Sequence, residues 1–157
     1  MRKEAVSFFL AALAVLMLPL TWWLSAAVAA IFHEACHLLV LFLMREKVSS
    51  FDVTFRGCTI VTGNMPEWKQ AVSILAGPAG SLSLLFLRRK LPLIALCGLF
   101  HGVYNLLPVF PLDGGRLFCL VLRRICPRYA DTVLKATQII VRILLFLSLV
   151  YILFLGM

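Results

Sequence analysis

Two histidines and a glutamate lie close together in residues 31–39, which read IFHEACHLL. In a helix His33 and His37 are one turn apart and face the same way, while Glu34 lies about 100° round the helix axis. This spacing is typical of a hydrolytic zinc site, in which two imidazoles bind the ion and the carboxylate serves as general base. The competing interpretation is a hydrogen-bonded core histidine and a coincidental match to the motif.

The surroundings of HEACH favour the zinc site over a coincidence. The motif lies within an apolar run at residues 21–44, which is long enough to cross a membrane as a helix. An ionisable side chain in the middle of a membrane costs about 2.5 to 3.5 kcal/mol on insertion scales, so such residues usually have a function. Two histidines and a glutamate at that depth therefore indicate a functional site.

A catalytic zinc usually takes three protein ligands and leaves its fourth position to water, so HEACH lacks one ligand. Asp113 is the best candidate, because it combines a predicted membrane depth with a constrained backbone. It lies in residues 105–115, NLLPVFPLDGG, where two prolines and two glycines exclude a continuous helix. Asp113 could also be the N-cap of the helix that follows, and the two roles are compatible.

Two further polar residues precede Asp113. Asn105 lies eight residues before it and is a candidate donor to the oxyanion that forms during hydrolysis. A polar contact between helices explains Asn105 nearly as well. His101, one helical turn earlier, could be a proton shuttle, a substrate contact or a packed histidine bonded to a neighbour, and the last role is favoured.

The composition excludes an ordinary soluble domain. The chain has 157 residues, of which 62% are hydrophobic and 14% are charged, and its mean hydropathy is +1.01. These values predict an all-α polytopic membrane protein. The net charge of +8 does not indicate nucleic acid, because the basic residues form short clusters between apolar runs, where they set topology and contact lipid headgroups. The basic residues Arg2, Lys3, Arg45 and Lys47 predict a cytosolic N-terminus.

The apolar runs predict one membrane domain over residues 1–157 with about five spans. A short β-hairpin is expected at about 48–62, where apolar and polar residues alternate, although an irregular amphipathic loop is equally compatible. We expect Gly and Pro at 76–80 to interrupt the third span, and a broken loop near 108–112 to precede the helix that carries Asp113. The expected spans cover about 5–20, 21–44, 67–87, 91–123 with that break, and 132–155.

HEACH on a membrane helix, a later span with Gly-Pro and the motif NLLPVFPLDGG together resemble the site-2 protease family of intramembrane zinc metalloproteases. The resemblance covers about residues 25–120. It implies that an unwound substrate adds as a strand to the edge of a membrane-associated hairpin before hydrolysis. The roles it implies are one zinc ion bound by His33, His37 and Asp113, a general base at Glu34, and a substrate or transition-state contact at Asn105.

Within that family the small size resembles the stage IV sporulation protein FB type, which releases a membrane-tethered pro-sigma factor. The implied partners are a membrane-embedded or membrane-tethered substrate protein, such as a pro-sigma or anti-sigma factor, the lipid bilayer and a separate inhibitory membrane protein, but no nucleic acid. Two positions depart from the family, which often has Gly where Cys36 lies and Asn near the position of Gly80 or Ser81. A thiol beside a ligand could crowd the metal or make the site sensitive to oxidation.

The resemblance predicts a protease that hydrolyses a peptide bond in or next to a membrane segment. The alternative is a non-catalytic metal-binding membrane protein, either a pseudoprotease or a transport component. A pseudoprotease would most simply lack Glu34 or a ligand, whereas this chain has all of them. A transporter would be expected to show inverted repeats or a second polar helix, and the sequence shows neither.

Overall fold

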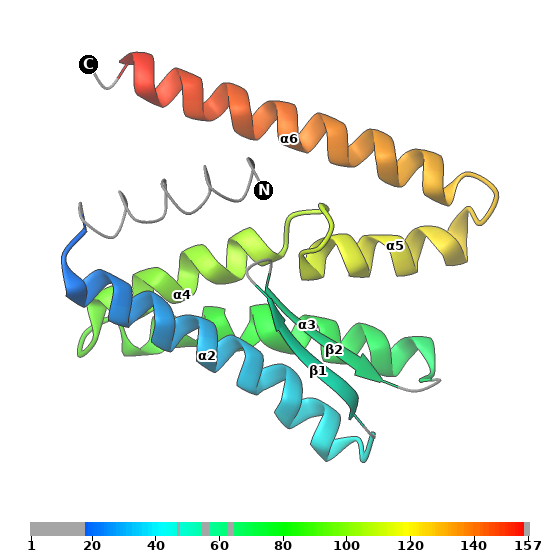
Figure 1. The fold of residues 1–157 in the computed structure, drawn as a ribbon, viewed down its shortest axis with the longest axis horizontal. Coiled ribbons are helices and arrows are strands. Elements are labelled where there is room, and N and C mark those ends of the chain that lie inside the picture. The colour runs from blue at the N-terminus through cyan, green and yellow to red at the C-terminus, as the bar shows by residue number, and fades with distance from the viewer. Residues whose placement is uncertain (1–17, 47, 55–56, 63–64, 156–157) are drawn as a thin grey trace.

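A computed structural model describes residues 18–46, 48–54, 57–62 and 65–155 of the chain. The expected span at 5–20 therefore lies almost entirely outside the described residues. The elements, shown in Figure 1, are α2 (Leu20–Leu43), β1 (Val48–Thr54), β2 (Gly57–Thr62), α3 (Glu67–Ser83), the 3-10 helix η1 (Leu84–Leu87), α4 (Pro92–Asn105), α5 (Asp113–Ile125) and α6 (Ala130–Leu155).

Helices α2, α3 and α4 pack against one another, α5 packs against α3, and α6 packs against α5 (Figure 1). The buried residues of α2 follow one another at every fourth position, so they form a single stripe along the helix. Four of its five residues are small or polar, whereas large apolar residues such as Ile31 and Phe42 are exposed. Polar residues inside and apolar residues outside are typical of a helix surrounded by lipid. The buried stripe comprises Ser25, Ala29, His33, His37 and Leu41.

Helix α3 continues through Gly77 and Pro78 without a break, and both residues are buried. The expected interruption at 76–80 is therefore wrong. A proline removes one backbone donor, but α2 and α4 pack on both sides of this segment and keep it helical. The helix tightens only later, where it becomes the 3-10 turn Leu84–Leu87.

The chain breaks between α4 and α5, where residues 106–112 form an irregular connection. Two glycines at the start of α5 allow this loop to fold tightly over the helix end. A Cβ atom at Gly114 would lie 2.1 Å from the carbonyl oxygen of Leu106, and one at Gly115 would lie 2.5 Å from the carbonyl carbon of Val109. The alternative role of Asp113 as N-cap is wrong, because Leu112 is the N-cap and Asp113 is the first helical residue.

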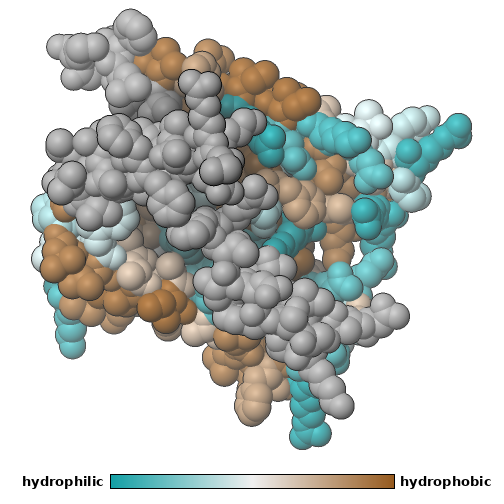
Figure 2. Space-filling model, in the orientation of Figure 1, coloured by the Kyte–Doolittle hydropathy of each residue, from teal (hydrophilic) through white to brown (hydrophobic). Residues whose placement is uncertain are grey.

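Strands β1 and β2 pair antiparallel, with Phe51 opposite Ile60 and Val53 opposite Cys58. Among the described residues, two helical segments are long and apolar enough to cross a membrane, namely Leu20–Leu43 and Glu67–Leu87, and α4 is a shorter apolar helix. The total of five spans and the membrane association of the strands stay predictions. Figure 2 shows large hydrophobic patches on the visible surface, with hydrophilic residues gathered mainly toward the right of the view.

Candidate metal centre

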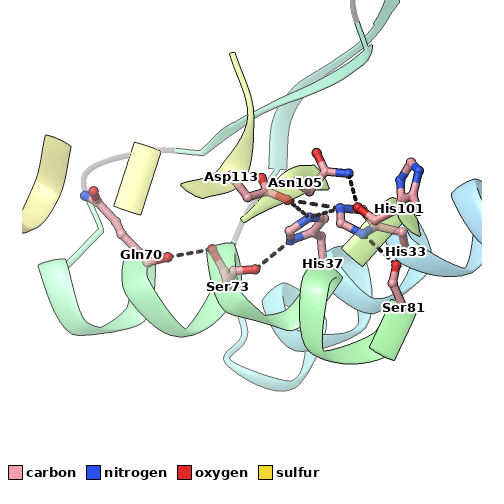
Figure 3. A network of polar contacts seen from close by, with 8 residues as sticks. All are labelled: His33, His37, Gln70, Ser73, Ser81, His101, Asn105 and Asp113. Carbon is pink, nitrogen blue, oxygen red and sulfur yellow. Dashed lines mark hydrogen bonds and ion pairs between the residues drawn. The ribbon is translucent and has the colours of Figure 1, made fainter. Parts of the chain in front are cut away.

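His33, His37 and Asp113 converge in the interior, although α5 is far from α2 in the sequence. Their exposed fractions are 2%, 8% and 7%. One carboxylate oxygen, Oδ2 of Asp113, lies 3.0 Å from Nε2 of His33 and 3.1 Å from Nε2 of His37. The two Nε2 atoms are 3.1 Å apart, and Figure 3 shows the three groups pointing toward one another. Nitrogen and oxygen atoms from three buried side chains thus form a triangle with nearly equal sides.

This triangle has the size and chemistry that a zinc ion requires. Ligand atoms about 2.0 to 2.1 Å from a tetrahedral zinc are about 3.3 Å from one another, which is close to the separations found here. Two imidazoles and one carboxylate also form a ligand set that zinc accepts. Gly77 leaves space beside them, because a Cβ atom there would lie 2.1 Å from Nε2 of His37 and 2.6 Å from Nε2 of His33. The residues present therefore fit a zinc ion.

Helix α3 supplies a hydrogen-bond partner to the far side of each imidazole. Nδ1 of His37 donates to the backbone carbonyl of Ser73 over 2.6 Å. Since a carbonyl only accepts, this ring carries its hydrogen on Nδ1 and presents the lone pair of Nε2 to the triangle. Nδ1 of His33 lies 2.9 Å from the hydroxyl of Ser81 in a buried contact (Figure 3).

The motifs of the sequence do not by themselves indicate these two contacts of Ser73 and Ser81. A signal was present, because Ser73, Gly77 and Ser81 follow one another at intervals of four and therefore lie on one face of an apolar helix. Small and polar residues on one face of a membrane helix indicate a close contact with another helix. What the pattern could not indicate is that the opposite helix is α2 and that its histidines meet this face.

The remaining predicted residues lie around the triangle. Glu34 directly follows His33 on α2, is half-buried and is outside the cluster of three ligand atoms. The Asn105 side chain donates through Nδ2 to the carbonyl of His101 over 3.0 Å, one turn back in α4. The His101 ring packs edge-on against the His33 ring, with 4.6 Å between centroids and 84° between planes.

Cys36 packs against α3 instead of joining the ligand cluster that the described residues form. A Cβ atom at Gly80 would lie 2.2 Å from Sγ of Cys36, so the thiol occupies the space that a side chain at position 80 would need. Cys36, the first departure expected from the family pattern, therefore lies against Gly80, one of the two positions considered for the second departure. A larger residue on α2 is accommodated by a glycine on α3.

Comparisons with known proteins identify the family of this chain. The sequence model of Peptidase family M50 matches residues 58–151, and the Peptidase M50B-like model matches residues 6–87. Nothing among the curated proteins matches the chain. The fold is similar to a site-2 protease from Methanocaldococcus jannaschii, with a TM-score of 0.59 and 24% identity over 85% of this chain and 66% of that one. Each family model matches more than half of the chain, which therefore belongs to Peptidase family M50, the membrane-embedded site-2 proteases.

Proposed function

We propose that the protein is an intramembrane zinc metalloprotease that hydrolyses a peptide bond in or next to a membrane segment of a substrate protein. The observation that carries this proposal is the buried triangle of His33, His37 and Asp113, formed by helices whose other faces expose large apolar residues. A hydrolytic site at this place would act on a peptide that is itself within or beside the bilayer. Membership of a metallopeptidase family supports the same reaction class.

One zinc ion would be held by His33, His37 and Asp113. Bound zinc supplies Lewis-acid chemistry, in that it lowers the pKa of a water molecule to about 7 and polarises the peptide carbonyl. Glu34 would be the general base that accepts a proton from the attacking water molecule and later returns it to the leaving amine. Its half-buried position beside His33 suits this role, since a general base must reach both water and substrate.

Asn105 is proposed to donate a hydrogen bond to the substrate carbonyl oxygen as negative charge develops on it. One hydrogen of its amide group is directed to the carbonyl of His101. A second hydrogen remains, because a side-chain amide has two donors. The bond to His101 therefore orients the amide without using its full capacity.

We propose that the substrate binds to the strands β1 and β2. Within the described residues β1 and β2 form a sheet of two strands, so no further strand pairs with either outer edge there. An extended peptide can add to such an edge through backbone hydrogen bonds. Extension is needed because a peptide bond inside a helix is shielded from water. We propose a membrane-embedded or membrane-tethered regulatory protein, such as a pro-sigma or anti-sigma factor, as the substrate.

The proposed setting is a cell membrane that the chain crosses about five times, with a cytosolic N-terminus and the zinc site within the bilayer. A separate inhibitory membrane protein is proposed as a further partner. The competing function, a non-catalytic metal-binding membrane protein, is disfavoured because Glu34 lies beside a complete set of three ligands. A protein that only retains a partner would have no need for that carboxylate.

The test compares wild type with Glu34→Gln, both purified in detergent. Zinc content is measured for each, and cleavage of a candidate membrane substrate is followed. We expect both to bind zinc, because Glu34 is outside the ligand cluster, and only wild type to cleave. Equal cleavage by the two proteins would contradict the role of Glu34, and absence of zinc from both would contradict the site.

A further inference from the structure

The hydroxyl of Ser81 forms a hydrogen bond with His33, one of the proposed metal ligands. Among the residues that the structure describes, the hydrogen-bond partner recorded for its Oγ is Nδ1 of His33, at 2.9 Å. Ser81 has an exposed fraction of 0%, so water does not compete for this bond. The other ring nitrogen of His33 is the one that faces Asp113 and His37. The bond from Ser81 therefore acts on the ring from the side opposite the proposed metal.

The backbone at Ser81 is held by close packing of α4. A Cβ atom at Gly98 would lie 2.7 Å from the carbonyl oxygen of Ser81, and one at Gly102 would lie 3.1 Å from its Cβ atom. The two glycines are four residues apart and face α3 together, which allows the two helices to approach closely. Ser81 consequently cannot move away from His33 without displacing α4.

The two histidines differ in the partner that fixes them. The carbonyl that accepts the hydrogen bond from Nδ1 of His37 belongs to the backbone of Ser73, so no side-chain substitution removes this bond. The partner of His33 is a side chain, and a hydroxyl both donates and accepts. When Nε2 of His33 binds a metal, its hydrogen must be on Nδ1, and Ser81 is then the acceptor that holds the ring in that tautomer and orientation.

We propose that Ser81 is a positioning residue that orients His33 for metal binding. The proposal rests on the function proposed above, because it concerns the same metal. The proposal goes beyond that function, because it predicts that Ser81 controls metal affinity although Ser81 binds neither metal nor substrate. Partners of this kind typically change metal affinity 10- to 100-fold when they are removed.

The test is metal binding by the full chain in detergent, with cobalt(II) as a spectroscopic substitute for zinc. Each variant is freed of metal with a chelator and titrated with cobalt(II), and its visible absorption spectrum is recorded. We expect Ser81→Ala to bind cobalt(II) about 10- to 100-fold more weakly than wild type and with a changed spectrum, because the imidazole is no longer held. The matched control is Ser83→Ala, whose exposed hydroxyl donates to the carbonyl of Gly80 and should leave both properties unchanged.

Each outcome decides between the two proposals. If wild type binds metal and Ser81→Ala loses less than about threefold in affinity with an unchanged spectrum, the positioning role is wrong and the proposed function stands. If folded wild type binds neither cobalt(II) nor zinc, the metal centre itself is wrong. Thermal unfolding of the metal-free proteins identifies a variant that does not fold. Ser81→Cys then replaces Ser81→Ala, because a thiol is a weaker hydrogen-bond partner, and affinity equal to wild type would overturn the inference.

Discussion

At the scale of single residues, the candidate metal centre depends on which ring nitrogen of each histidine already has a hydrogen-bond partner. Nδ1 of His37 is directed to Ser73 and Nδ1 of His33 to Ser81, so both Nε2 atoms face the carboxylate of Asp113. The spacing of HEACH predicts that the two imidazoles share a face of one helix. It does not predict their outer partners, because these come from α3 and depend on how two helices meet.

The roles of Asp113 and Asn105 can be separated by substitution. Asp113→Asn should weaken zinc binding much more than Asn105→Ala, because the Asp113 carboxylate lies 3.0 Å and 3.1 Å from the two Nε2 atoms. The Asn105 amide is directed to a backbone carbonyl of α4. Zinc per chain, measured after equilibration with a competing chelator, gives the order of the two effects. The reverse order would mean that the third ligand has been assigned wrongly.

Gly77 should be essential for metal uptake. In Gly77→Ala the new methyl group would lie 2.1 Å from Nε2 of His37, where it would displace the imidazole or occupy the space of the ion. We expect zinc content to fall to background. Ala79→Ser on the exposed side of the same turn is the matched control and should bind zinc like wild type. Normal zinc content in Gly77→Ala would show that the metal lies elsewhere.

At the scale of elements, the apolar runs predict helices well and their contacts poorly. The run at 21–44 corresponds to α2, and the prolines before Asp113 together with the glycines after it predict the break that separates α4 from α5. The break expected in α3 is absent, because neighbouring helices compensate for Pro78, and such compensation is invisible in the sequence. The contact between Cys36 and Gly80 is likewise hidden, since it joins residues from two helices.

That contact predicts a measurable coupling between α2 and α3. Gly80→Ala should destabilise the protein by about 1–3 kcal/mol, because its methyl group would overlap Sγ of Cys36. In a Cys36→Gly background the same substitution should cost much less, since the overlapping atoms are gone. The free energy of unfolding of the four proteins, measured by denaturant titration in detergent, gives the coupling energy. Additive effects would show that the two residues do not touch.

At the scale of the whole molecule, an apolar exterior surrounds a polar centre. This arrangement is the reverse of that in a soluble protein, which has a polar surface and an apolar core. Composition alone predicts it, because a mean hydropathy of +1.01 leaves too few polar residues to cover the surface of a soluble protein. The family models and the similar fold place the chain among membrane-embedded peptidases. The number of spans cannot be obtained in the same way, since only two helical segments in the described part of the chain meet the length and hydropathy expected of a membrane helix.

In the proposed zinc site two histidines and one aspartate bind the ion, and the thiol of Cys36 does not. X-ray absorption spectroscopy of the zinc-loaded full chain in detergent distinguishes these ligands, because a zinc–sulfur bond is longer than a zinc–nitrogen or zinc–oxygen bond. We predict one zinc per chain with a first shell of nitrogen and oxygen at about 2.0–2.2 Å, including two imidazoles. A shell that contains sulfur at about 2.3 Å, or a shell with fewer than two imidazoles, would contradict the assigned site.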